Sequence, residues 1–185
     1  MNRQQPNLSF DQEALARYNV LAINTGSTST KIAVYNGLTP IVEMSIAHST
    51  EELSQFKSVP EQYEWRKDVI LKVLGDKGFD IDTLSAVIGR GGLLRPIESG
   101  VYEVNQTMID ELKQCSPQHA SNLGAIIANE IATGCQGKAY ITDPVVVDEL
   151  DEISSKHALA LTELKTMETD LANANKEPGY AAISK

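Results

Sequence analysis

The sequence predicts an α/β domain in which a mixed sheet, beginning with an antiparallel meander, is packed against helices. Three strand-like segments follow one another up to about residue 48 with only short turns between them, which favours antiparallel pairing. Beyond about residue 60, segments with helical spacing of apolar residues alternate with short apolar runs, as in crossover connections. With 185 residues, 42% of them hydrophobic, the chain can build one domain with a sizeable core.

The meander is predicted directly after a polar leader, residues 1–19. VLAIN, residues 20–24, has the composition of a buried strand, and TKIAVYNG, residues 30–37, alternates as a second strand should. Asn36-Gly37 is a typical hairpin turn, so TPIVEMSIAH is expected to return as the third strand.

The next segments predict a helix from about residue 60 to 74, followed by the buried strand SAVIGRGG, which runs into a glycine turn. VYEVN predicts a short strand. Two helices are expected over NQTMIDELKQ and residues 120–132, and KAYITDP closes the pattern as a strand ended by Pro144. The predicted domain covers residues 20–150. Residues 151–185 are helix-forming in composition but contain few large apolar side chains, which predicts a helical tail.

Charge and composition exclude several classes of function. The net charge of −9 and the pI near 4.8, without any basic run, argue against a nucleic-acid partner. The chain shows neither the apolar core of a signal peptide nor an apolar stretch long enough to span a membrane, so we expect no membrane partner and a cytoplasmic location. Cys115 and Cys135 are too few for a disulfide framework and have no metal-binding spacing.

A small polar segment, INTGSTSTK, separates the first two predicted strands. Such a turn can direct several backbone N–H groups at one point, and the hydroxyls of Ser27 and Ser29 with the ammonium of Lys31 would add donors there. The segment lacks the second glycine of a Walker A loop, and a strand follows where a Rossmann motif needs a helix. By chemistry alone, the segment is equally compatible with a phosphate cradle and with a ligand-free hairpin turn.

Four segments together resemble the N-terminal half of the butyrate kinases, within the acetate and butyrate kinase family. They are INTGSTSTKIAVYNG, AVIGRGGLLRPIESGVYEVN, QHASNLGAIIANEIA and YITDPVVVDEL, in that order. The resemblance implies an RNase H-like domain of the actin/hexokinase-like fold, whose first hairpin carries the phosphate loop. It further implies transfer of a phosphoryl group between ATP and a short-chain carboxylate (butyrate + ATP to butyryl phosphate + ADP), with ATP/ADP and Mg²⁺ as cofactors.

The resemblance assigns phosphate and ATP binding to the first turn and its flanks. The matching positions are Asn24, Gly26, Ser27, Ser29 and Lys31, with Asn24 also a candidate Mg²⁺ ligand. Thr25 stands where the family usually has proline, a departure expected to loosen the turn.

Three further residues match catalytic positions of the family. Arg90 would grip the carboxylate and the transferring group through its guanidinium fork, and His119 would lie near the transferring phosphoryl. Asp143 would position the metal or orient Arg90. Taken alone, each has a plainer interpretation: a surface arginine, a histidine capping a helix, and an aspartate starting a turn before proline.

The family's second domain, with its adenosine-binding loop, is not recognisable after residue 150. Two hypotheses therefore stand beside each other: a kinase half that needs a complementary C-terminal domain, and a non-catalytic fragment or phosphate- or nucleotide-binding module of the same fold. The expected partners are a short-chain carboxylate and either that domain or a second copy of the chain. An RNase H-like nuclease is disfavoured by the acidity and by the lack of a carboxylate cluster for two metals.

Overall fold

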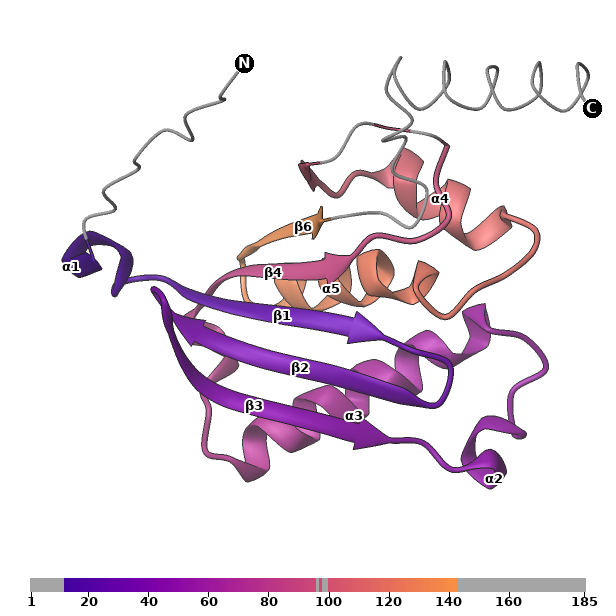
Figure 1. The fold of residues 1–185 in the computed structure, drawn as a ribbon, viewed down its shortest axis with the longest axis horizontal. Helices are drawn as coiled ribbons and strands as arrows, with labels where there is room; N and C mark the ends of the chain where they lie inside the picture. The colour runs from indigo at the N-terminus through magenta and orange to yellow at the C-terminus, as the bar shows by residue number, and fades with distance from the viewer. Residues whose placement is uncertain (1–11, 96, 98–99, 143–185) are drawn as a thin grey trace, which may run out of the picture. The chain divides into compact units, whose positions relative to one another are not determined.

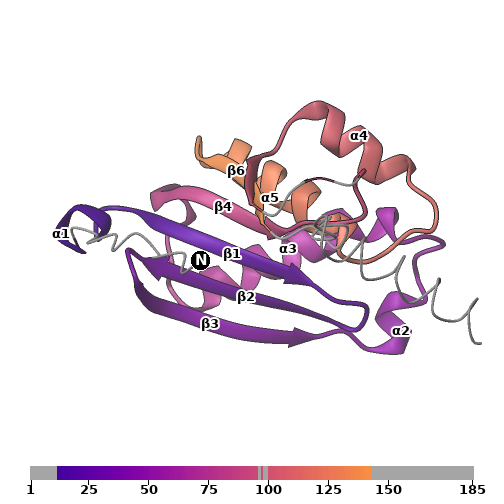
Figure 2. The same ribbon diagram turned by 45° about the horizontal axis from the view of Figure 1, so that its top comes forward.

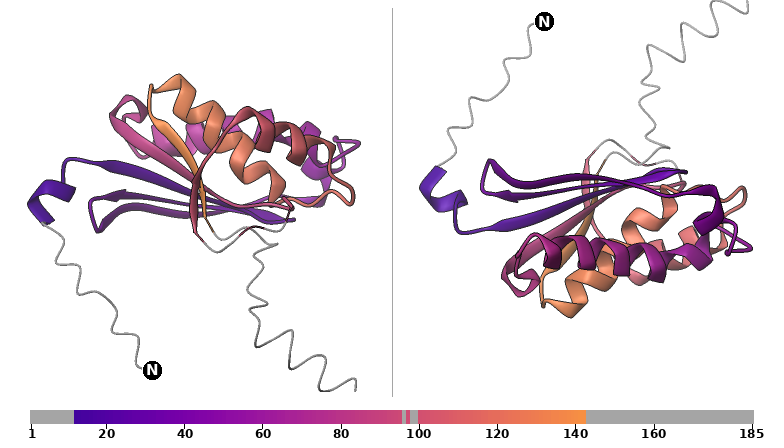
Figure 3. Two further views of the ribbon diagram at one scale, coloured as in Figure 1. Left: turned by 90° about the horizontal axis from the view of Figure 1, so that it is seen from above. Right: turned by 90° about the horizontal axis from the view of Figure 1, so that it is seen from below.

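The computed structural model describes residues 12–95, 97 and 100–142, all within one compact unit. Asp143, the tail 151–185 and the first eleven residues of the expected leader lie outside the described residues. The described part forms a six-stranded sheet with helices α3 and α5 packed on one face, as Figures 1 and 3 show.

The sheet has the strand order β3-β2-β1-β4-β6-β5. The strands are β1 (Asn19–Thr25), β2 (Ser29–Asn36), β3 (Thr39–Ala47), β4 (Leu84–Arg90), β5 (Val101–Glu103) and β6 (Lys138–Thr142). The first three form the predicted antiparallel meander, whereas β1, β4 and β6 run parallel. The first five strands in this order make the RNase H-like mixed sheet that the sequence predicted, and β5 adds an antiparallel edge beside β6.

The predicted helices are also confirmed. They are α3 (Tyr63–Asp76), α4 (Gln106–Gln114) and α5 (Asn122–Gly134), with 3-10 turns at Pro60–Gln62 and Ile81–Thr83. Two single-turn helices were not predicted: α1 (Gln12–Leu15), inside the expected leader, and α2 (Thr50–Leu53). A capping box between Ser49 and Glu52 starts α2, so a local signal for it was present in the sequence. No helix in the described part is both long and apolar enough to cross a membrane.

The core lies between the sheet and helices α3 and α5. Figure 2 shows the sheet and these helices from a second direction. Alternate residues of the first two strands face the helices, which gives the period-two burial that the sequence pattern indicated. The core side chains from strands and helices include Leu21, Ile23, Ile32, Val34, Ile70, Leu74, Val87, Leu123, Ile126, Ile127 and Ile131. The opposite face of the meander carries none of the described helices (Figure 3).

Two glycines allow β4 and α5 to touch through their backbones. A Cβ on Gly89 would overlap the carbonyl of Gly124, and a Cβ on Gly124 would overlap the carbonyl of Arg90. The helix therefore crosses the end of β4 at a distance that no larger residue permits. This crossing fixes the segment before α5 next to the ends of β1 and β4.

His48 follows β3 and is buried against the β1–β2 hairpin. Its Nε2 lies 2.8 Å from Thr30 Oγ1, and its ring stacks at a tilt against Trp65, with 4.8 Å between centroids. Burial lowers the pKa of His48 below its ordinary value, and the nearby charge of Arg66 lowers it further, while Glu52 opposes the change. Thr30 Oγ1 also accepts from Arg66 Nη1 at 3.1 Å, so the hydroxyl joins the guanidinium and the imidazole in one buried network.

Replacing Gly89 or Gly124 by alanine should destabilise the domain by about 1–3 kcal/mol, because each methyl group would force β4 and α5 apart. Gly134→Ala, in the same helix with open space around it, is the matched control and should be neutral or stabilising by up to about 1 kcal/mol. Urea unfolding of the three variants measures this. Parent-like stability of Gly124→Ala would contradict the close crossing.

The depressed pKa of His48 should make stability depend on pH. Because the folded state binds fewer protons than the unfolded state around the ordinary pKa of 6.5, the contribution of His48 is complete above that pH and lost as the pH falls below it. The free energy of unfolding should therefore fall more steeply between about pH 7 and pH 5 in the parent than in His48→Gln, by at most about 1.4 kcal/mol per pH unit, the limit for one proton. Equal slopes would show that His48 is protonated without penalty.

Candidate functional site

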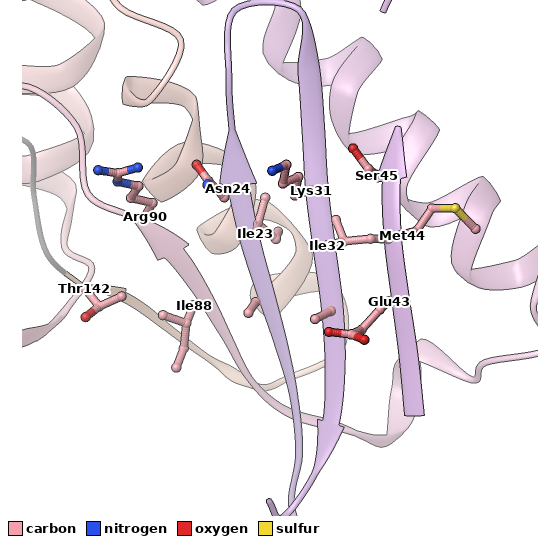
Figure 4. Close-up of a pocket in the computed structure, with 12 residues that line it drawn as sticks. Ile23, Asn24, Lys31, Ile32, Glu43, Met44, Ser45, Ile88, Arg90 and Thr142 are labelled. Atoms are coloured by element: carbon pink, nitrogen blue, oxygen red, sulfur yellow. The ribbon is translucent and has the colours of Figure 1, made fainter. Parts of the chain in front are cut away.

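The strand register aligns five polar residues in one row across the open face of the sheet. Lys31 pairs with both Asn24 and Ser45, and Arg90 pairs with Thr142. The pairing of Ile23 with Gly89 places Asn24 next to Arg90. Figure 4 shows Arg90, Asn24, Lys31 and Ser45 side by side across the sheet. The row lies at the end of β1 where the chain enters the hairpin turn.

The row borders a shallow cavity of about 730 Å³ on this face. Its lining consists of Ala22, Ile23, Asn24, Lys31, Ile32, Ala33, Glu43, Met44, Ser45, Ile88, Arg90 and Thr142. The next row along the same face is mainly apolar, with Ala33, Ala22 and Ile88 in register. The side chains of Asn24, Lys31 and Arg90 are exposed and make no hydrogen bond or ion pair within the described part of the chain. These donors are thus available to a ligand, and among the described residues Glu43 is the one carboxylate in the lining.

The hairpin turn next to this row is held from the helix side by Arg66 of α3. The guanidinium donates to three backbone carbonyls, those of Gly26 (2.9 Å), Ser27 (3.2 Å) and Ser29 (3.4 Å). The remaining carbonyl of the turn, that of Thr28, accepts from the backbone N–H of His48 at 2.9 Å. Every carbonyl from residue 26 to 29 is therefore bound by a donor inside the domain.

The same geometry turns backbone donors outward. In a trans peptide the carbonyl and the following N–H point in opposite directions, so carbonyls directed at Arg66 place the N–H groups of Ser27 and Thr28 on the other side. Neither N–H has a hydrogen-bond partner among the described residues. Backbone N–H groups and hydroxyls of this kind are donors that suit an anion. The phosphate cradle itself stays a prediction.

Thr25, at the end of β1, ties the turn to the segment before α5. Its side chain is only 2% exposed, and its hydroxyl donates to the carbonyl of Ala120 at 2.8 Å. We expected this residue to loosen the turn, because the family usually has proline there. The structure shows instead that the threonine adds a buried hydrogen bond that proline could not make.

That link brings the turn containing His119 to the end of β1. His119 is exposed, and its Nδ1 accepts from the backbone N–H of Ser121 at 3.2 Å and lies 2.7 Å from Ser121 Oγ. Because a backbone N–H can only donate, Nδ1 is unprotonated, and Nε2 carries the proton of the neutral ring. His119 can therefore offer one N–H donor to a ligand near the hairpin. It does not line the cavity.

Asn122, in the first turn of α5, holds the glycine loop after β4. Its Oδ1 accepts from the N–H of Leu93 at 2.8 Å, and its Nδ2 donates to Cys115 Sγ at 2.8 Å. A Cβ on Gly92 would lie 2.6 Å from Asn122 Cα, so the loop passes close to the helix. The side chain of Asn122 therefore positions the loop that follows Arg90.

The described residues provide no protein-only metal centre, since no three His, Cys, Asp or Glu side chains cluster in that part of the chain. Asn24, Ser45 and Thr142 offer neutral oxygens in the polar row. Magnesium that arrives with a nucleotide takes most of its ligands from phosphate and water, so one or two such oxygens suit it. The donor set therefore fits nucleotide-bound Mg²⁺ rather than a resident ion.

The structure thus brings together Asn24, Lys31 and Arg90 in the row and Gly26, Ser27 and Ser29 in the adjacent turn, with His119 nearby and Asp143 outside the described residues. Sequence reasoning missed Arg66, His48, Ser45 and Thr142. A signal existed for Arg66, since it occupies the buried stripe of α3 at helical spacing from Ile70 and Leu74. Thr142 and Ser45 have no such signal, because only the register places them.

Comparison with known proteins identifies relatives for most of the chain. Butyrate kinase 2 of Clostridium acetobutylicum is 52% identical over 139 residues, which are 75% of this chain and 39% of that protein. Butyrate kinase 1 of the same organism is 51% identical over 144 residues, 77% of this chain and 41% of that protein. The chain spans about two fifths of the length of these curated relatives. No family model matches it.

Among solved structures, an acetate kinase from Porphyromonas gingivalis aligns with a TM-score of 0.45 and 15% identity, covering 68% of this chain and 37% of that one. The sequence identity to the two butyrate kinases is much higher. It confirms the resemblance that the four motifs indicated: over three quarters of its length, this chain is a relative of the butyrate kinases.

Proposed function

We propose that this chain supplies the phosphate- and carboxylate-binding part of a carboxylate kinase that transfers a phosphoryl group between ATP and a short-chain carboxylate such as butyrate, giving butyryl phosphate and ADP. The observation that carries the proposal is the row of free donors, Lys31, Asn24 and Arg90, beside a turn whose N–H groups face outward. The two butyrate kinases described above, each identical to this chain at about half of the aligned residues, support it.

In this proposal the hairpin turn binds the phosphates. The N–H groups of Ser27 and Thr28, the hydroxyls of Ser27 and Ser29, and the ammonium of Lys31 all donate to anionic oxygens. Phosphoryl transfer is mostly positioning and charge neutralisation, so such donors supply what the reaction requires. Asn24 would contribute an oxygen to Mg²⁺ bound by ATP or ADP, and the ion would neutralise phosphate charge.

Arg90 would bind the carboxylate and the equatorial oxygens of the moving phosphoryl group. Its guanidinium fork suits two oxygens at once. A short-chain carboxylic acid has a pKa near 4, so the acceptor is ionised at neutral pH and needs no general base. One carboxylate oxygen bonds to the γ-phosphorus as the bond to the bridging oxygen of ADP breaks. His119 would donate its Nε2–H to the same group, and Asp143 would orient Arg90 or the metal.

A complementary C-terminal domain would complete the site, since the chain spans only part of its relatives. In this arrangement residues 20–150 are the kinase domain, residues 151–185 a helical tail, and the adenosine site lies on the complementary part. The alternative, a phosphate- or nucleotide-binding module without catalysis, uses the same turn. Formation of acyl phosphate after association with the complementary part distinguishes the two hypotheses, whereas phosphate binding does not.

The side chains of the turn should contribute to phosphate binding but not to the stability of the fold. Ser27→Ala, Ser29→Ala and Lys31→Ala should each weaken pyrophosphate binding severalfold, as expected for the loss of one donor to a charged group, with unchanged melting temperature. Lys72→Ala is the matched control, because Lys72 is exposed on α3 and does not line the cavity. Isothermal titration calorimetry measures the affinities. Parent-like affinity of all three variants would refute the phosphate cradle.

Catalysis should require the complementary part. The chain alone should form negligible acyl phosphate, because one domain cannot exclude water from the transferring group. Addition of the C-terminal part of a butyrate kinase should restore formation from ATP and butyrate, and Arg90→Lys should then lower the rate about a hundredfold or more. Hydroxylamine trapping of acyl phosphate reports both results, with Arg95→Lys as the control on an exposed arginine. Absence of activity after demonstrated association would favour the non-catalytic module.

A further inference from the structure

We infer that Arg66 is a positioning residue for phosphate binding: its buried guanidinium, held on the helix side of the first hairpin, fixes the direction of the peptide groups that face the anion. The nature of the ligand rests on the proposed function. The orientation of the turn rests only on contacts within the domain.

The guanidinium is completely engaged by neutral acceptors. Besides the turn carbonyls, Arg66 Nη1 donates to Thr30 Oγ1 at 3.1 Å, while Nε and Nη2 donate to Gln62 Oε1 at 3.1 and 3.0 Å. Arginine has five N–H donors, and these contacts account for all of them. The side chain is only 1% exposed, and no carboxylate forms an ion pair with it in the described part of the chain.

An unpaired buried cation is costly for folding, so its position calls for an explanation other than stability. Arg66 lies on the same buried stripe of α3 as Ile70 and Leu74, where an apolar side chain would pack without that cost. With an apolar residue, however, the carbonyls of Gly26 and Ser27 would lose their buried donors and the peptide groups would be free to rotate. The arginine therefore selects one orientation of the turn.

That orientation serves anion binding in two ways. The negative ends of the peptide dipoles point at Arg66, so their positive ends, the N–H groups of Ser27 and Thr28, point away from it toward the ligand side. The charge of Arg66 is not neutralised by a neighbouring carboxylate among the described residues, so it also adds a positive potential behind the turn. Lysine would keep the charge but has three donors on one nitrogen instead of a planar fork.

Arg66→Lys tests this inference, and Gln62→Leu provides a second variant that releases the guanidinium on one side without altering the turn itself. The full chain is titrated with pyrophosphate well below the melting temperature of each variant, and the backbone N–H resonances of Ser27 and Thr28 are followed by NMR. Arg95→Lys, on an exposed arginine paired with Glu111, is the matched control.

We expect Arg66→Lys to weaken pyrophosphate binding about tenfold or more and Gln62→Leu severalfold, the range for lost hydrogen bonds to a charged group. The resonances of Ser27 and Thr28 should move in both variants, while those of the β1 and β4 core stay in place. Parent-like affinity in folded Arg66→Lys would overturn the inference, and so would unchanged Ser27 and Thr28 resonances. If the parent itself binds no pyrophosphate, the proposed function fails, while the ligand-free resonances still decide whether Arg66 orients the turn.

Discussion

The hydrogen bonds between the Arg66 guanidinium and the carbonyls of the first hairpin turn are the contacts on which the proposed site depends. They come from α3, about forty residues away in sequence, and they reach the turn between β1 and β2. Thr30 accepts from the same guanidinium and lies 2.8 Å from His48 Nε2, so helix, hairpin and the end of β3 are joined at one point. Because a protonated His48 would place a second cation beside Arg66, the network disfavours the charged imidazole and lowers the pKa of His48.

A second constraint aligns the other side of the site. Gly89 and Gly124 let α5 approach β4 through the backbone, and the segment before α5 then meets the end of β1 through the Thr25 hydroxyl. Asn122, at the start of the same helix, holds the loop that follows Arg90. The arginine of the polar row and the histidine before α5 are thus positioned by one helix, while the turn is positioned by another. Small changes in either helix would alter the spacing between the hairpin turn, which we propose to bind phosphate, and Arg90, which we propose to bind the carboxylate.

The open face of the sheet explains why this domain is proposed to work with a complementary part. Exposed cations, Lys31 and Arg90, border an apolar floor that includes Ala22 and Ile88, with no described helix on that face. Such a surface can bind and orient an anion. Phosphoryl transfer additionally needs water to be excluded from the moving group, and a shallow cavity on one side of a sheet cannot achieve that alone.

The sequence by itself determined the element order, the meander and most of the donors. Alternating burial in strands and helical spacing of apolar residues are local patterns, and the run of small polar residues around Gly26 is local as well, although by chemistry alone it fitted a phosphate cradle and a ligand-free turn equally. The tertiary structure decided which residues share a row and what holds the turn. Thr142 joins Arg90 only through pairing of β4 with β6, which is distant in the sequence, whereas Ser45 meets Lys31 across the β2–β3 hairpin. Arg66 becomes part of the site because a helix crosses beneath the hairpin, and the donors of a buried guanidinium bind whichever carbonyls the packing brings within reach. The chemical type of each side chain can be read from the sequence, whereas the partners of a buried charge depend on contacts between elements that are far apart in the sequence.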